Sequence, residues 1–517
     1  MHSEKHFTVM PINQLKAGAV LNYAIIGLNA IVGLVYTPYM LHKLGQSEYG
    51  LFSLVSSVIS YLTLMDFGFG NAVVRYTAKY RAEGKTDEQY YLFGMLFIFY
   101  AIISVLVFAG GIIMSCNAEK MFDETMNPLE IERAKTMLII LAFNMMITFV
   151  FQIFGAIITA YEDFVFQKTI QIIRLILNTL TMIILLHNGY RAVAMVIAIT
   201  VFNVVSLLIN LFYCKSKLKI KLKFGHFDKT LAAEIAVYAF WIFLNAIMDK
   251  IYWNTGQFVL GITSGTIAVS VFAVAINFEH IYMSFSTAIN SVFLPKVTGM
   301  VANNQNVKAI SDLFIRTGRI QYTIMAFVFA GFCVFGSQFI KIWAGEEYSD
   351  SYYVTIMFFG ALIIPLIQNM GITILQARNQ MKFRSLLYIV IAFVSLIGQY
   401  FLSKTFGIFG CAISISAALI LGQGIVMNIY YQKRQSIDIK AFWVEIIKMS
   451  IAPTIVSVAS YFVLQYIDIQ SYTKLFACIL IFSLVYVPSF WIFSMNNYEK
   501  ELIGKPIKRI FAKFPVR

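Results

Sequence analysis

The sequence is dominated by runs of about twenty largely apolar residues that follow one another almost from end to end. At about 1.5 Å per residue, each run has the length that one α-helix needs to cross the hydrocarbon core of a membrane. Hydrophobic residues make up 59% of the 517 residues, whereas soluble proteins contain about 45 to 50%. Transmembrane β-strands would show segments of about ten residues with alternating polarity, and we find none. The sequence therefore predicts an all-α integral membrane protein.

The apolar runs divide into about 14 predicted transmembrane helices. We place them at 17–42, 48–74, 90–115, 136–160, 164–186, 192–213, 231–260, 266–293, 320–342, 352–376, 385–403, 408–430, 446–466 and 475–495. An even number of spans puts both termini on the same side of the membrane. Most of the 40 Lys and Arg residues lie in the termini and in the connections on that side. Because positive residues collect on the cytoplasmic side, we expect both termini to be cytoplasmic.

A lysine-rich stretch separates two sets of six predicted spans. It has six lysines between Lys215 and Lys229. The first set opens with "LNYAIIGLNAIVGLVYTPY" and the second with "AVYAFWIFLNAIMDKIYWN", which share an aromatic residue, an apolar run and LNAI. We therefore expect a six-helix lobe at 1–214, a basic cytoplasmic linker at 215–230 and a second six-helix lobe at 231–432. Residues 433–517 would add two helices and a basic tail. Paired bundles of this kind are typical of transporters.

The connections between the spans leave little room for a soluble catalytic surface, so we do not expect an enzyme. No GxxxxGK[ST] phosphate loop, HExxH, CxxC or G-x-S-x-G motif is present, and we expect neither a cofactor nor a metal site. The five cysteines are scattered singly and are interpreted as small apolar side chains. The formal net charge of +14 follows from the basic cytoplasmic connections, so nucleic acid is not expected as a partner.

Arg174 is the most unusual residue of the predicted spans, because it lies about ten residues into the span 164–186. This depth corresponds to about 15 Å, close to the membrane midplane. Gln171, Arg174 and Asn178 follow at i, i+3 and i+7, so they share one face of the helix. A polar face is wasteful against lipid, and a guanidinium suits planar phosphate groups. We interpret this face as part of a cavity lining, with a structural ion pair as the alternative for Arg174.

Other predicted spans also contain polar residues, which are the default functional candidates in a membrane protein. These candidates are Asn22, Asn29, Asp66, Asn245, Asp249, Lys250, Asn277, Glu279 and His280. Several have structural alternatives: Asp66 fits an ion pair that fastens its helix, and His280 fits a hydrogen-bonded interior residue. Asp249 and Lys250 point about 100° apart on a helix, so both cannot face one target. We take Arg174 and Lys250 as the candidate cations for an anionic substrate.

The segment "LGQSEYGLFSLVSSVISYLTLMDFGFGNAVVRYTAKYRAEGK" (44–85) resembles a known signature. It is similar to the N-terminal region of the polysaccharide flippases of the multidrug/oligosaccharidyl-lipid/polysaccharide exporter superfamily, the Wzx-type translocases of O-antigen and capsule repeat units. The positions that carry the resemblance are Gly45, Glu48, Tyr49, Gly50, Asp66, Gly68 and Gly70. The resemblance extends along most of the chain. It is supported by the predicted number of spans, the two lobes with two extra helices and the cytoplasmic termini.

The resemblance implies a carrier without ATPase activity in the bacterial cytoplasmic (inner) membrane. Such a carrier moves undecaprenyl-pyrophosphate-linked oligosaccharide from the inner to the outer leaflet, for capsule or lipopolysaccharide, by alternating access through a cationic cavity. Its expected partners are this lipid-linked glycan, membrane lipid, and a polysaccharide polymerase with other assembly proteins. Three alternatives stay open: a cation-coupled small-molecule or drug exporter, a lipid II flippase, and a scaffold protein without transport activity. Drug exporters of the superfamily typically have a carboxylate in the first span, and the span 17–42 has none.

Overall fold

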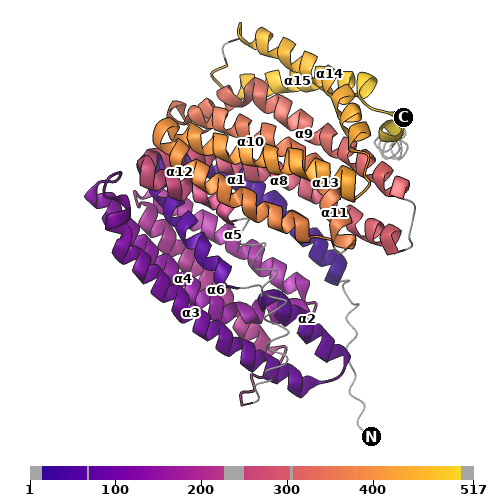
Figure 1. Cartoon of the computed structure of the whole chain (residues 1–517). Helices are drawn as coiled ribbons and strands as arrows, with labels where there is room; N and C mark the ends of the chain where they lie inside the picture. The colour runs from indigo at the N-terminus through magenta and orange to yellow at the C-terminus, as the bar shows by residue number, and fades with distance from the viewer. Residues whose placement is uncertain are drawn as a thin grey trace, which may run out of the picture. The chain divides into compact units, whose positions relative to one another are not determined.

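The computed structural model describes residues 14–66, 69–225, 250–302, 307–378, 380–467 and 469–501. These residues are almost all helical, and none of them lies in a β-strand (Figure 1). Besides helical residues 250–263, the helices are α1 (Gln14–Leu62), α2 (Phe69–Ala82), α3 (Thr86–Phe122), α4 (Pro128–Ala160), α5 (Phe164–His187), α6 (Ala192–Ser216), α8 (Gly265–Ala302), α9 (Val307–Trp343), α10 (Asp350–Ile367), α11 (Asn369–Ala377), α12 (Lys382–Leu419), α13 (Met427–Arg434), α14 (Ile439–Leu464) and α15 (Tyr472–Phe493). Two 3₁₀ turns (Thr63–Asp66 and Glu346–Tyr348) and a π-helical segment (Ile420–Val426) complete the described elements.

Eleven helical segments of this described part are long and apolar enough to cross a membrane. Two of them each contain a pair of predicted spans, because α1 and α12 continue through a glycine with non-helical backbone. Gly45 has φ 75° and Gly407 has φ 56°, a left-handed conformation that glycine adopts without steric cost. The predicted span 231–260 falls mostly outside the described residues. The structure confirms the predicted all-α membrane fold, and the protein is a multi-pass membrane protein.

The second predicted span, 48–74, ends earlier than expected. The helix stops at Leu62, a 3₁₀ turn follows at Thr63–Asp66, and α2 begins at Phe69 as a separate helix. The last turn of α2 carries Lys79 and Arg81. The signature segment is therefore divided between the second half of α1, the 3₁₀ turn and α2.

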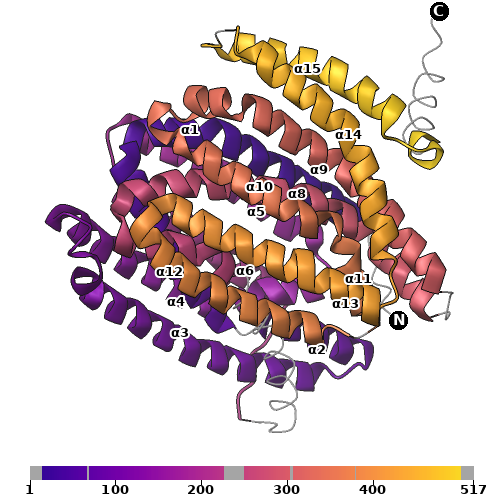
Figure 2. The same ribbon diagram turned by 45° about the horizontal axis from the view of Figure 1, so that its top comes forward.

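The chain forms two compact units, Met1–Ser270 and Val271–Arg517. In the first unit α3 packs along α4, α4 along α6, and α1 along α5 (Figures 1 and 2). Aromatic and aliphatic side chains of α2, α3 and α4 form its core, including Tyr76, Phe93, Tyr100 and Ile153. The predicted lobe boundaries at 214 and 231 stay a prediction.

The signature residues after Gly45 fasten several helices of the first unit together. The Glu48 carboxylate pairs with Arg133 of α4 and accepts a hydrogen bond from the backbone N–H of Ala192, the first residue of α6 (3.3 Å). Gly50 allows the start of α8 to approach α1, because a Cβ atom at Gly50 would lie 1.8 Å from the Thr266 carbonyl oxygen. Part of the signature therefore has a packing role.

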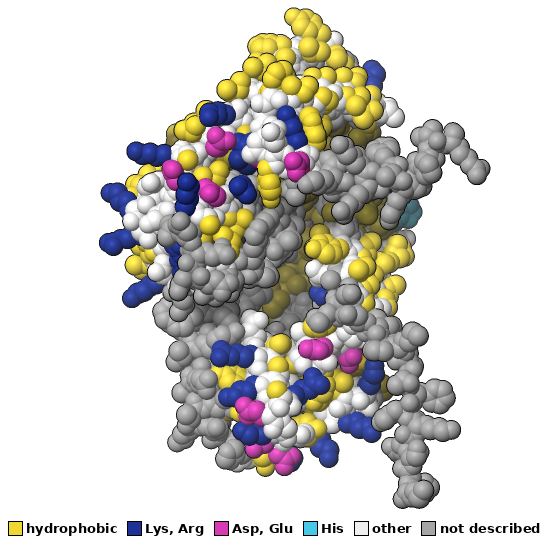
Figure 3. Space-filling model, turned by 90° about the vertical axis from the view of Figure 1, so that its right-hand side faces the viewer, with side chains coloured by type: hydrophobic (Ala, Val, Ile, Leu, Met, Phe, Trp, Pro, Cys, Tyr) yellow, Lys and Arg dark blue, Asp and Glu magenta, His cyan; other side chains and the backbone are white. Residues whose placement is uncertain are grey.

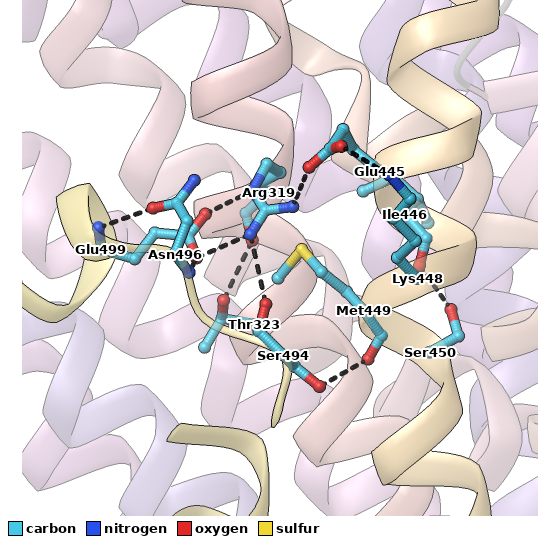
Figure 4. A network of polar contacts seen from close by, with 10 residues as sticks. All are labelled: Arg319, Thr323, Glu445, Ile446, Lys448, Met449, Ser450, Ser494, Asn496 and Glu499. Atoms are coloured by element: carbon cyan, nitrogen blue, oxygen red, sulfur yellow. Dashed lines mark hydrogen bonds and ion pairs between the residues drawn. The ribbon is translucent and has the colours of Figure 1, made fainter. Parts of the chain in front are cut away.

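In the second unit α9 packs against α10 and α14, α10 packs against α12, and α14 and α15 lie side by side (Figure 2). A buried network of polar contacts joins α9, α14 and the residues after α15 (Figure 4). Its centre is Arg319 of α9, whose guanidinium donates to Glu445 of α14, to the Ser494 carbonyl oxygen and to both carboxylate oxygens of Glu499. This network fastens the last two helices to the rest of the unit.

Charged side chains gather toward helix ends. The last turn of α2 carries Lys79 and Arg81, and the last turn of α13 carries Lys433 and Arg434. Figure 3 shows groups of Lys and Arg side chains at the surface. Arg174 departs from this distribution, because it lies in the middle of α5.

Candidate functional site

A cavity of about 380 Å³ lies among α1, α4, α5 and α6 in the first unit. Its apolar lining includes Leu175 and Phe202, and its polar lining residues are Asn29, Asn144, Thr148, Gln171, Arg174, Asn178 and Asn203. Amides therefore dominate the polar lining, and Arg174 is the cation among the described residues that line it.

Helix α5 supplies three of these residues from one face. The i, i+3, i+7 spacing of Gln171, Arg174 and Asn178 places their side chains on the same side of the helix, and all three line the cavity. Asn29 of α1 lies at the same cavity, and its side-chain Nδ2 donates to the Ile25 carbonyl oxygen (3.0 Å). The structure thus brings together four of the residues predicted from the sequence.

In the described part of the chain, the Arg174 guanidinium has a single polar partner. Its Nη1 donates to Oδ1 of Asn203 on α6 at 2.9 Å. Within the described residues no carboxylate lies within ion-pair distance of Arg174. A guanidinium has five N–H donors, so most of its hydrogen-bonding capacity is available to a ligand in the cavity.

Asn203 is held in turn by α4. Its Nδ2 donates to Oδ1 of Asn144 (2.7 Å) and to Oγ1 of Thr148 (2.7 Å). The Thr148 hydroxyl donates to the Asn144 carbonyl oxygen (2.7 Å). Sequence reasoning missed these three residues. The available signal was that each is a polar residue inside an apolar run, with Asn144 and Thr148 four apart on one face of α4.

A second cation, Lys168, lies on the same helix as Arg174 and was also missed. Its Nζ donates to Oδ1 of Asn22 on α1 at 2.9 Å. Asn22, one of the predicted polar residues, therefore contacts α5, but it is not among the described residues that line the cavity. Asn178 also lines the cavity, and its buried Oδ1 has no hydrogen-bond partner within the described chain.

The other candidates from the first predicted lobe and the seventh span are not among the described residues that line the cavity. Lys250 is half-buried at the start of the helical residues 250–263 and is not one of the described lining residues of the Arg174 cavity. Asn245 and Asp249 lie outside the described residues. The backbone of Asp66 ends the 3₁₀ turn at Thr63–Asp66, and its side chain is outside the described part.

The candidates on α8 divide between two faces of that helix. Asn277 is half-buried, and His280 is exposed along with Ser284 and Thr287. Glu279 is instead fully buried in the second unit. The His280 Nδ1 lies 3.3 Å from a Glu279 carboxylate oxygen. The structure therefore buries the carboxylate of Glu279 beside the exposed His280.

Comparisons with solved structures show which known proteins share this fold. The fold matches the lipid II flippase MurJ in an inward closed conformation with a TM-score of 0.72 and 16% identity, over 94% of this chain and 99% of that chain. It also matches an inward-facing multidrug resistance MATE family transporter of the MOP superfamily, with a TM-score of 0.61 and 16% identity over 80% of this chain and 99% of that chain. The chain therefore shares its fold with these two transport proteins.

A family model shows the family of the chain. The model described as "Polysaccharide biosynthesis protein" matches residues 43–353, more than half of the chain. The chain therefore belongs to the family of polysaccharide biosynthesis proteins, in agreement with the resemblance carried by its signature segment. No curated protein matches the sequence.

Proposed function

We propose that the protein is a flippase that moves undecaprenyl-pyrophosphate-linked oligosaccharide from the inner to the outer leaflet of the bacterial cytoplasmic membrane, for surface polysaccharides such as capsule or lipopolysaccharide. The observation that carries this proposal is the Arg174 cavity: a guanidinium without a carboxylate partner among the described residues, surrounded by amides, in a spanning helix. Membership in a polysaccharide biosynthesis family supports a glycan as the cargo.

The cavity chemistry fits an anionic head with sugars. The available N–H groups of Arg174 can replace water around a phosphate, because charge-assisted hydrogen bonds from guanidinium are strong and directional. Gln171, Asn178 and Asn29 offer amide donors and acceptors, and sugar hydroxyls can both accept and donate. Phe202 adds an apolar face against which a sugar ring can pack. Lys250 is the second proposed cation for the pyrophosphate.

Charge also gives the transport its direction. The interior of the cell is negative, so the membrane potential favours movement of the negatively charged pyrophosphate to the outer leaflet. A membrane potential contributes about 2.3 kcal/mol per charge per 100 mV, so about two negative charges give roughly 5 kcal/mol. The protein need only lower the barrier. We propose that it does so by alternating access, in which the site faces the two sides in turn, without ATP hydrolysis.

A lipid II flippase is the second candidate, because the solved structure of that name covers almost the whole chain. Its cargo shares the lipid-linked pyrophosphate chemistry and differs in the glycan. A deletion strain separates the candidates. Accumulation of cytoplasm-facing lipid-linked repeat units with normal peptidoglycan supports the polysaccharide flippase, accumulation of lipid II supports the alternative, and altered drug tolerance with normal surface glycan contradicts both.

A variant strain tests the proposed cations. The double variant Arg174→Ala, Lys250→Ala, shown to be inserted and stable, should export little surface glycan. Normal export by this variant would contradict the assignment of these cations.

A further inference from the structure

We propose that Asn203 is a positioning residue, which fixes the Arg174 guanidinium in the cavity and leaves its positive charge available to the anionic head of the cargo. This inference rests on the proposed function and extends it to a residue on a different helix. It is carried by the three hydrogen bonds that Asn203 makes between α4, α5 and α6.

The surroundings of Asn203 determine which end of its amide faces Arg174. An amide nitrogen has two N–H donors, and Nδ2 of Asn203 donates to both Asn144 and Thr148. The Thr148 hydroxyl hydrogen is directed at the Asn144 carbonyl oxygen, so its oxygen is free to accept from Asn203. With both N–H groups engaged on α4, Oδ1 is the end that faces the guanidinium of Arg174.

The acceptor that holds Arg174 is neutral. An aspartate at position 203 has nearly the same shape and would also bind the guanidinium, but as an ion pair it would cancel the charge. Asparagine instead orients one N–H of Arg174 and leaves the other donors and the full charge for a ligand. Arg174 has no counter-ion among the described residues, and an uncompensated charge in the middle of a spanning helix is unfavourable for insertion. Such a cost is expected of a binding residue more than of a structural one.

The Asn203 amide therefore has two effects that variants can separate. It orients the Arg174 guanidinium, and it does not neutralise the charge of that guanidinium. Asn203→Ala removes the orientation and leaves the charge. Asn203→Asp retains a hydrogen-bond acceptor and neutralises the charge. If Asn203 had only a structural role, both variants would weaken pyrophosphate binding in proportion to their loss of thermal stability. A positioning residue should lose anion binding in Asn203→Asp well beyond the loss in Asn203→Ala, although neither variant can donate to Asn144 and Thr148, because the aspartate alone neutralises Arg174.

The test uses the purified full-length protein, inorganic pyrophosphate as the probe, and two measurements on each variant: pyrophosphate affinity at two salt concentrations and thermal stability. Asn210→Ala is the matched control, because Asn210 is a half-buried amide two turns further along α6 and is not among the described lining residues. We expect pyrophosphate to bind at least tenfold more weakly to Arg174→Gln and to Asn203→Asp than to the wild type. The affinity of these two variants should no longer depend on the salt concentration. Asn203→Ala should bind severalfold more weakly, and Asn210→Ala should bind like the wild type.

The outcomes distinguish this inference from the proposed function. Wild-type pyrophosphate affinity in Arg174→Gln would overturn the role of Arg174 and with it the role of Asn203. Loss of binding in Arg174→Gln together with wild-type affinity in Asn203→Asp would overturn the positioning role alone. Pyrophosphate binding to Asn203→Asp that is no weaker than to Asn203→Ala would also overturn it, because the charge of the side chain at position 203 would then have no effect on the ligand.

Discussion

Arg319 and Glu499, 180 residues apart in the sequence, form a bidentate ion pair in which both side chains are buried. The Nε–Oε1 distance is 2.6 Å and the Nη2–Oε2 distance is 3.0 Å, and the side chains are 5% and 3% exposed. Glu499 also closes a reciprocal pair of hydrogen bonds with Asn496 at the start of the helical turn after α15. The attachment of the last two helices is therefore centred on one buried guanidinium.

We predict that Glu499→Gln destabilises the protein strongly. The variant leaves the buried Arg319 guanidinium with Glu445 as its remaining carboxylate partner among the described residues, and breaking a buried ion pair costs about 3 to 5 kcal/mol. Glu445→Gln is the matched control, because the Glu445 side chain is 36% exposed and also contacts Lys448 (3.5 Å). Thermal unfolding in detergent should show a much larger decrease in Tm for Glu499→Gln. Equal Tm values for the two variants would contradict the buried-pair interpretation.

Gly50 gives a second prediction on stability. A Cβ atom at this position would lie 1.8 Å from the backbone oxygen of Thr266, which cannot move as a side chain can. Gly50→Ala should therefore lower Tm and the yield of monodisperse protein, by an amount typical of overpacking, about 1 to 3 kcal/mol. Gly27→Ala, on the same helix with nothing within 4 Å of the added Cβ, should be neutral or stabilising. A tolerated Gly50→Ala would show that α1 and the start of α8 are not in close contact.

The two cations of α5 should differ in their importance for transport. Lys168 already donates to Asn22, whereas Arg174 is held by one neutral amide and lines the cavity. Lys168→Gln should lower the rate of surface glycan export about twofold to fivefold, as for a weak, solvent-screened charge. Arg174→Gln should lower it roughly tenfold or more, because a hydrogen bond to a charged group contributes about 1.5 to 3 kcal/mol. Complementation of a deletion strain, with membrane levels of each variant matched, measures both. A larger loss of export in Lys168→Gln than in Arg174→Gln would contradict this prediction and would indicate a substrate site nearer to the Lys168 end of α5.

Periodicity within a single helix was enough to find one wall of the cavity. The spacing of Gln171, Arg174 and Asn178 predicts a shared face, and the structure places that face on the cavity. Asn144 and Asn203 come from other helices, and a sequence does not show which faces of two helices meet. The all-α fold class was predictable for a simpler reason. In lipid, the backbone N–H and C=O groups of an apolar run must form their hydrogen bonds within the protein, and a helix of about twenty residues does this by itself.

Two local differences from the prediction also have physical causes. The second predicted span is interrupted after Leu62, where the hydroxyls of Ser57, Ser60 and Thr63 each donate to a carbonyl oxygen three residues back. Such bonds favour the tighter 3₁₀ turn that follows. Glu279 and His280 are neighbours in sequence, but adjacent helical residues point about 100° apart. One is therefore buried and the other exposed.

The most direct test is the rate at which the purified full-length protein, reconstituted in liposomes, moves undecaprenyl-pyrophosphate-linked oligosaccharide between leaflets. The wild type, Arg174→Lys and Arg174→Gln should be compared, with and without an interior-negative potential. We expect the potential to accelerate outward movement by the wild type, Arg174→Gln to be at least about tenfold slower, and Arg174→Lys to fall between them. Wild-type rates in Arg174→Gln, with the protein shown to be folded, would contradict the claim that this guanidinium carries the anionic head across the membrane.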